Sequence, residues 1–243
     1  MSNKPNVIKK DKQGGIELID KVKTAKEAIA NIKDGASIMI GGFMACGSPE
    51  ILVDALVEKN VKNLTIIGND AGVPGRGIGK LLTNGQIKTL IASHVGLNPE
   101  VAERMNTDDP ERKLECKLIP QGTLAEKIRA AGGGLGGFLT PTGVGTIVAD
   151  GKQVINVNGR DYLLEEPLKA DFAFIRGSVT DTFGNTTYNG TTRSFNPMMA
   201  TACDEVIVGT CQIVDMGAID PNTIVTSGIF VDSIVGGEKP WQI

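Results

Sequence analysis

Short apolar runs alternate with segments of helical periodicity along most of the chain, and this alternation constrains the fold more than any other feature. Strands that alternate with helices form a mainly parallel sheet covered by helices on both faces. The sequence therefore predicts an open α/β fold, with a mainly parallel sheet and helices on both faces. The expected strands are Ser37–Ile40, Leu64–Ile67, Thr89–Ala92, Leu114–Ile119, Phe172–Ile175 and Val206–Val208.

Helix start signals lie between these runs. Thr24 and Glu27 form a capping box, which predicts a helix over Ala25–Lys33. Ser48 and Pro49 are expected to cap and begin a helix that reaches Lys59. Further helices are expected to begin near Gly79, at Asn98-Pro99, at a second capping box of Thr123 with Glu126, and at Asn196-Pro197.

One hairpin interrupts the α/β pattern. The runs Gln153–Val157 and Arg160–Leu164 flank Asn158-Gly159, and this dipeptide strongly favours a tight turn between antiparallel strands. We find no internal repeat and no linker that would separate two domains. We therefore expect a flexible tail over residues 1–15 and a single domain over residues 16–243.

Composition excludes several classes of function. The net charge is −3 and no predicted helix carries a basic stripe, so nucleic acid is not an expected partner. The polar N-terminal residues contain no apolar signal core, and no apolar run approaches the roughly 20 residues of a membrane helix, which predicts a cytoplasmic protein without membrane contact. Four separated cysteines and one histidine form no recognisable metal spacing, so no metal is expected: Cys46, Cys116, Cys203, Cys211 and His94.

Three strand-to-helix junctions carry groups that could bind a ligand. Gly41–Gly47 is a glycine-rich loop before a helix, where backbone N–H groups favour an anionic or polarised oxygen. Asn69 and Asp70 follow one expected strand and Gln121 follows another, so all should lie at the carboxyl edge of the sheet. Each also has a structural explanation, as a tight turn, as turn-shaping side chains or as an incidental residue beside a helix cap.

Three other motifs give weaker signals. Gly132-x-Gly134-x-x-Gly137 has dinucleotide-loop spacing but follows a helix, so NAD binding is not expected. Gly79-Lys80 resembles the end of a phosphate-binding loop. However, Pro74 stands where the first glycine of that motif belongs, and Leu81 stands where Ser or Thr should bind magnesium. His94 lacks the surroundings of a hydrolase motif, so we expect a structural role at a strand end.

Five segments together resemble the α subunits of family I CoA transferases. They are Gly-Gly-Phe before a helix, Asn-Asp-Ala-Gly, Pro-Gln-Gly-Thr-Leu-Ala-Glu, Phe-Leu-Thr-Pro-Thr-Gly-Val-Gly-Thr and Phe-Asn-Pro. The likeness runs in order from about Val22 to Val235. Gly77–Leu81 and Ala92-Ser93-His94 make the chain most similar to the α subunits of the acetate or butyrate:acetoacetate enzymes.

The resemblance implies a divided active site. In such enzymes the β subunit has a glutamate, within a Ser-Glu-Asn-Gly motif, that attacks the acyl-CoA and carries CoA as a glutamyl thioester. This chain has no Ser-Glu-Asn-Gly, so we expect no catalytic nucleophile here, a β-subunit partner and an αβ hetero-oligomer. CoA thioesters would be substrates and not bound cofactors, with acetoacetate, acetate or butyrate as acids.

The resemblance also assigns residues to this site. Asn69, Asp70 and Gln121 match positions that line the acyl pocket, although Asp70 stands where the 3-oxoacid type carries Asn, a hydrogen-bond donor. Two alternatives to a CoA-transferase α subunit remain. One is a sugar-phosphate isomerase, since those enzymes share the sugar-phosphate-isomerase/CoA-transferase-like fold that the resemblance implies, and the other is a non-catalytic scaffolding subunit. The stretch treated as the CoA-binding loop is matched by Gly41, Gly42, Phe43, Met44, Ala45, Cys46 and Gly47.

Overall fold

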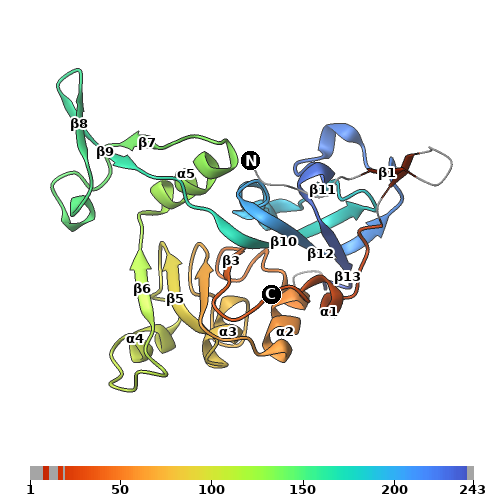
Figure 1. The fold of residues 1–243 in the computed structure, drawn as a ribbon, viewed down its shortest axis with the longest axis horizontal. Helices are drawn as coiled ribbons and strands as arrows, with labels where there is room; N and C mark the ends of the chain where they lie inside the picture. The colour runs from red at the N-terminus through yellow and green to blue at the C-terminus, as the bar shows by residue number, and fades with distance from the viewer. Residues whose placement is uncertain (1–7, 11–15, 19, 240–243) are drawn as a thin grey trace.

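The computed structural model describes residues 8–10, 16–18 and 20–239 (Figure 1). Its centre is a mainly parallel sheet in the order β13-β12-β10-β3-β4-β5-β6, with β11 paired antiparallel to β10. The strands are β3 (Ser37–Ile40), β4 (Leu64–Ile67), β5 (Ile87–Ala92), β6 (Glu115–Leu118), β10 (Ala170–Asp181), β11 (Thr186–Thr187), β12 (Cys203–Val214) and β13 (Ser233–Gly236). The predicted open α/β fold is confirmed.

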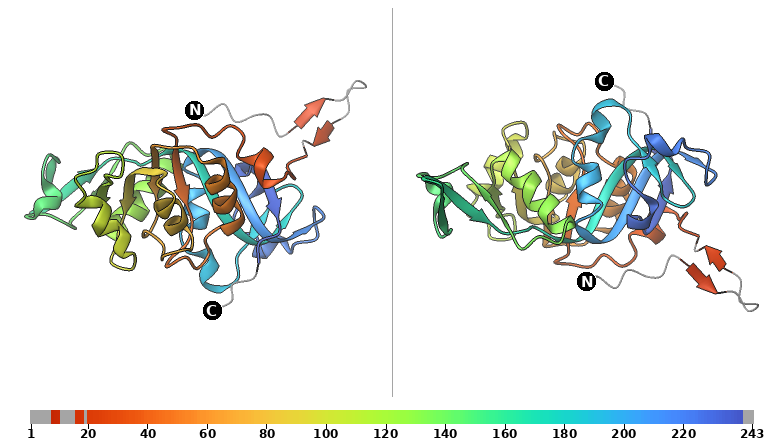
Figure 2. Two further views of the ribbon diagram at one scale, coloured as in Figure 1. Left: turned by 90° about the horizontal axis from the view of Figure 1, so that it is seen from below. Right: turned by 90° about the horizontal axis from the view of Figure 1, so that it is seen from above.

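Helices cover both faces of the sheet (Figures 1 and 2). One face packs against α1 (Ala25–Ala28), α2 (Glu50–Lys59), α3 (Ile78–Thr83) and α4 (Pro99–Met105). The other face packs against α5 (Gln121–Gly132) and α6 (Asn196–Met199). Short 3₁₀ turns are η1 (Ile147–Ala149), η2 (Gly190–Arg193), η3 (Pro221–Thr223) and η4 (Gly228–Phe230).

The apolar strands explain why there are two cores. Alternate side chains of a strand point to opposite faces, so Ile38 and Ile40 join one core while Met39 joins the other. All three side chains are at most 1% exposed. The continuous apolar runs in the sequence therefore correspond to strands that are buried on both faces.

The strand order places a topological switch point between β3 and β10. The chain adds β4, β5 and β6 on one side of β3, and it adds β12 and β13 beyond β10 on the other. In open parallel sheets, ligands bind beside the carboxyl ends of the strands at such a switch point. The loop that leaves β3 at this point is Gly41–Gly47.

A three-stranded antiparallel arm projects from one end of the molecule (Figures 1 and 2). It contains β7 (Phe138–Thr140), β8 (Val154–Val157) and β9 (Arg160–Glu165), in the order β7-β9-β8. The predicted turn at Asn158-Gly159 is confirmed, with both residues at positive φ as such a turn requires. The predicted tail lies mostly outside the described residues, which include from it only β1 (Ile8–Lys10), paired antiparallel to β2 (Ile16–Leu18).

Tertiary contacts changed several predicted boundaries. The capping box of α1 is present, but α1 ends at Ala28, and the carbonyls of Ile29 and Ala30 accept hydrogen bonds from Lys59. Ser48 does not cap α2, because the helix begins one residue later than predicted, at Glu50 with Pro49 at the N-cap; the Ser48 hydroxyl donates to the Gly41 carbonyl at 3.1 Å. The strand β13 was not predicted.

The second predicted capping box was wrong. The helix α5 begins two residues before Thr123, at Gln121, and Thr123 is buried inside it. Glu126 instead pairs with Arg129, one turn further along the helix, at 2.6 Å. The pattern was present in the sequence, but the helix had already begun after Pro120.

Glu165 connects the arm to α5. Its side chain is 1% exposed, and its two carboxylate oxygens pair with Lys127 of α5 at 3.0 Å and with Lys152 at 2.5 Å. Burial opposes ionisation, but the hydrogen bonds and charges of Lys152 and Lys127 outweigh it and lower the pKa of Glu165. The folded protein therefore favours the ionised carboxylate.

We predict that Glu165→Gln lowers the free energy of unfolding by about 1–3 kcal/mol at pH 7, because it removes a charge from two hydrogen bonds. A lowered folded-state pKa contributes stability above the unfolded-state pKa, and that contribution is lost as pH falls through the folded value. The difference between variant and wild type should therefore shrink towards pH 3, measured by urea unfolding. Glu166→Gln, at an exposed neighbour, is the control, and an equal loss in both variants would contradict the assignment.

Candidate active-site loop

The loop Gly41–Gly47 has a backbone that most side chains disfavour. The φ angles of Gly42, Met44, Ala45 and Gly47 are 121°, 50°, 61° and 79°. Met44 and Ala45 carry side chains, so each costs on the order of 1–3 kcal/mol unless the surroundings hold it in place. Two reciprocal hydrogen bonds of 2.9 Å between Phe43 and Cys46 close the loop on itself.

Gly41 and Gly47 are required by close contacts with the segment that leads into α6. A Cβ atom on Gly41 would lie 1.7 Å from the Asn196 side-chain oxygen, which no native contact allows. A Cβ atom on Gly47 would lie 2.9 Å from the Thr192 carbonyl oxygen. These glycines let the loop pack directly against the segment that begins α6.

Asp70 holds the loop from the end of β4. One of its carboxylate oxygens accepts the Met44 N–H and an Asn69 amide N–H, both at 2.8 Å, and the other accepts the Gly72 N–H at 2.8 Å. Asp70 is buried, and its side chain acts as an acceptor in all three bonds. An amide N–H₂ group in place of either carboxylate oxygen would lose at least one of these contacts.

Asn69 connects Asp70 to Gln121. Its side-chain oxygen accepts a hydrogen bond from the Gln121 amide at 2.6 Å and one from the Ser93 hydroxyl at 3.2 Å. The sequence separation of Asn69 and Gln121 is 52 residues, but both follow strands at the same edge of the sheet. The structure thus brings the three predicted pocket residues and the loop into one hydrogen-bonded network.

The network leaves few backbone donors for a ligand. The N–H groups of Phe43, Met44 and Cys46 already have acceptors. Within the described residues, those of Gly42, Ala45 and Gly47 have no protein acceptor. A cavity of about 10 Å³ beneath the loop, lined in part by Gly42, Ala45 and Asp70, has room for about one water molecule.

The side chains of the loop differ in accessibility. Phe43 and Met44 are 44% and 46% exposed, whereas Ala45 is buried. The Cys46 thiol lies 3.1 Å from the Thr191 hydroxyl. Phe43 and Met44 therefore form an apolar surface beside the loop that a ligand or another subunit could cover.

The carboxylates near the loop are already engaged. Glu50, at the start of α2, accepts the Gly77 N–H at 2.8 Å and pairs with Lys80 at 2.6 Å. Glu238 accepts the Ile51 N–H, and burial raises its pKa to about 7. Asp70, bound to three N–H groups, and Glu50 therefore have both carboxylate oxygens engaged by protein groups.

The residues of the weaker motifs make contacts within the protein. Lys80 forms ion pairs with Glu50 at 2.6 Å and with Asp54 at 2.5 Å. Gly132 ends α5, where a Cβ atom would lie 2.0 Å from the Thr201 hydroxyl, so close packing accounts for this glycine. His94 is exposed and forms a backbone bridge with Asp70 after β5.

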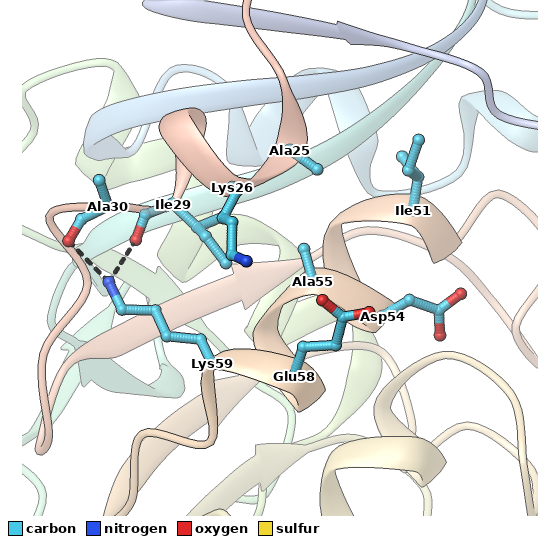
Figure 3. Close-up of a pocket in the computed structure, with 9 residues that line it drawn as sticks. All are labelled: Ala25, Lys26, Ile29, Ala30, Ile51, Asp54, Ala55, Glu58 and Lys59. Carbon is cyan, nitrogen blue, oxygen red and sulfur yellow. Dashed lines mark hydrogen bonds between the residues drawn. The ribbon is translucent and has the colours of Figure 1, made fainter.

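A groove of about 560 Å³ between α1 and α2 contains none of the predicted site residues (Figure 3). Lys59 extends across it to the carbonyls of Ile29 and Ala30.

The described part of the chain holds no group of three or more His, Cys, Asp and Glu side chains that could bind a metal. Over the same residues, no helix combines the length and apolar character needed to span a bilayer.

Comparison with known proteins identifies the family. The sequence profile described as Coenzyme A transferase matches residues 22–237. The alpha subunit of the Escherichia coli (strain K12) acetate CoA-transferase is 47% identical over 219 residues, which cover 90% of this chain and 98% of that protein. The Clostridium acetobutylicum acetoacetyl-CoA:acetate/butyrate CoA transferase alpha subunit is 51% identical over 203 residues, covering 84% and 91%.

A solved structure supports the fold. An acyl-CoA transferase from Escherichia coli O157:H7, in a thioester complex with CoA, aligns with a TM-score of 0.76 at 23% identity. The alignment covers 90% of this chain and 47% of the solved one, so this chain spans about half its length. With the profile match and the two relatives, the conclusion is that the chain belongs to the coenzyme A transferase family, as an α subunit.

Proposed function

We propose that this chain supplies backbone hydrogen-bond donors to an active site completed by a β subunit. The site would move CoA between a short-chain acyl-CoA and a carboxylate such as acetoacetate, acetate or butyrate. The observation that carries the proposal is the strained Gly41–Gly47 loop, held beside Asn69 and Gln121 at the switch point of the sheet. Its unused N–H groups belong to Gly42, Ala45 and Gly47.

The chemistry explains what such donors contribute. A glutamate on the β subunit first attacks the acyl-CoA carbonyl, and departure of the CoA thiolate leaves an acyl-glutamyl anhydride. The thiolate then attacks the glutamyl carbonyl, releases the acid and forms the glutamyl-CoA thioester. Each attack places negative charge on a carbonyl oxygen, and losing one donor to such an oxygen typically costs about 10² to 10³ in rate.

Several properties follow from the same proposal. CoA thioesters are substrates, no cofactor is permanently bound, and the protein acts in the cytoplasm within an αβ hetero-oligomer. The two relatives are named for acetate and for acetate/butyrate with acetoacetyl-CoA. Discrimination among such acids by hydrophobic fit amounts to only about 1–3 kcal/mol, so we propose the class of short acids and not one of them.

The engaged carboxylates favour this proposal over an enzyme that acts without a partner. A sugar-phosphate isomerase of this topology would need its own acid or base, and Asp70 and Glu50 are both occupied. A scaffolding subunit would have no need for a strained donor loop next to a polar network. Fold alone does not separate these functions, so the test must measure the reaction.

The experiment measures consumption of acetoacetyl-CoA with acetate or butyrate, using this chain alone and co-expressed with a β subunit that carries Ser-Glu-Asn-Gly. We expect activity only in the complex. Activity of the chain alone would mean that it contains its own nucleophile. A complex that assembles but transfers no CoA would exclude the proposed reaction.

Asp70→Asn should lower kcat of the complex by about tenfold. The new amide N–H₂ faces N–H groups whose hydrogen bonds the carboxylate now accepts. One mismatched buried hydrogen bond costs about 1–3 kcal/mol. Steady-state kinetics of the purified αβ complex provide the measurement. A variant with wild-type kcat would show that the hold on Met44 does not affect the reaction.

Gln121→Ala separates a pocket role from a scaffolding role. The amide of Gln121 donates to Asn69 and is otherwise exposed, so its loss should disturb the acyl pocket without unfolding the chain. We expect kcat/KM for the acid to fall about tenfold or more, which corresponds to roughly 1.4 kcal/mol of transition-state binding. Gln153→Ala, exposed on the arm, should change nothing, and equal kinetics for both variants would support the scaffolding interpretation.

A further inference from the structure

Asn196, the first residue of α6, ties the loop to β10, whereas Asp70 holds it from the end of β4. Its side chain is 0% exposed and lies between β10 and the loop. The side-chain amide donates to the Gly47 carbonyl at 3.0 Å and to the Thr192 carbonyl at 2.7 Å. The side-chain oxygen accepts the Arg176 N–H of β10 at 3.0 Å.

In this arrangement both polar groups of the Asn196 side chain have hydrogen-bond partners. Both amide hydrogens have acceptors, and the oxygen satisfies a backbone donor of a central strand. The same oxygen lies so close to Gly41 that no side chain fits there. Asn196 therefore contacts the loop at its first residue and at its last.

The two ends of the loop need separate supports. Asp70 holds the Met44 N–H in the middle of the loop from β4, but it makes no contact with Gly47. Because a peptide unit is planar, a bond to the Gly47 carbonyl fixes the Gly47–Ser48 peptide, whose N–H donates to the Ala45 carbonyl at 3.2 Å. Asn196 thereby restrains Gly47 and, through the Ser48 N–H, Ala45, from the β10 side of the switch point.

We propose that Asn196 is a positioning residue of the active site, which sets the geometry of the Gly41–Gly47 donors by tying the loop to β10. The inference rests on the proposed function for its kinetic consequence. Asn196 acts through the loop and touches no reacting atom. Its amide hydrogens, and not its volume alone, carry the role.

Asn196→Asp tests the amide while keeping shape. At pH 8 the ionised carboxylate would face the Gly47 and Thr192 carbonyls with no hydrogen to donate. A buried carboxyl with such neighbours favours its protonated form, which restores one donor as pH falls. The activity of the variant relative to wild type should therefore increase from pH 8 to pH 6.

Gln86 offers a matched control. Its side chain is 0% exposed, and its amide donates to the carbonyls of Leu56 and Val61 at 2.9 and 3.0 Å. Gln86 precedes β5, at the edge of the sheet opposite to the loop. Gln86→Glu therefore creates the same chemical mismatch, away from the site.

The experiment compares both variants as αβ complexes. For Asn196→Asp we expect kcat to fall about tenfold or more at pH 8, with a threefold or smaller change in KM for acyl-CoA, and the kcat ratio to wild type to recover towards pH 6. For Gln86→Glu we expect wild-type kcat at both pH values. Equal kcat and equal pH dependence for the two variants would overturn the proposal.

Amide hydrogen exchange provides a readout that does not depend on activity. Peptides covering Gly41–Gly47 should exchange faster in Asn196→Asp than in wild type, and not in Gln86→Glu. An inactive wild-type complex with this exchange pattern would reject the proposed function and keep the positioning role. If Asn196→Asp fails to fold, Gly41→Ala displaces the Asn196 amide instead, and unchanged exchange of the loop in that variant would overturn the proposal.

Discussion

The hydrogen bond from the Met44 N–H to the Asp70 carboxylate is the contact on which the candidate site depends. Two non-glycine residues of the loop, Met44 and Ala45, have left-handed backbone angles, and such angles persist only where neighbours compensate for their cost. Asp70 compensates from β4, and its own position is fixed by Asn69 and Gly72. The strain of the loop and the order of the strands are therefore linked.

The sheet determines which residues can take part. The loop follows β3, Asn69 and Asp70 follow β4, and Gln121 follows β6. Parallel strands have their carboxyl ends at one edge, so residues far apart in sequence meet there without any local contact between them. The loop itself lies at the switch point between β3 and β10, which gives it neighbours from both halves of the sheet.

Much of this could be predicted from sequence, and the exceptions have physical causes. Continuous apolar runs identified the strands from β3 to β6, and the strand ends identified Asn69, Asp70 and Gln121 as neighbours. Their assignment to substrate binding stays a prediction, as does that of the loop. The capping role of Ser48 was wrong because α2 begins at Glu50, which leaves Ser48 outside the N-cap position, where its hydroxyl donates to the Gly41 carbonyl.

Asn196 illustrates a different limit of sequence reasoning. The Phe-Asn-Pro segment correctly indicated the start of α6, and nothing local indicated that the Asn side chain spans Gly47 and Arg176. The missing information was the packing of α6 against the loop. Gly41 was interpreted from the sequence as a residue of a glycine-rich loop. The structure shows that its missing side chain also leaves room for the Asn196 side chain.

The most direct test of this account is a structure of the αβ complex trapped as the glutamyl-CoA thioester. The account predicts that the thioester carbonyl oxygen lies within hydrogen-bond distance of at least one N–H group among Gly42, Ala45 and Gly47, with Asp70 still bound to Met44. A thioester oxygen that is contacted only by the β subunit, with the loop turned away from it, would contradict the account.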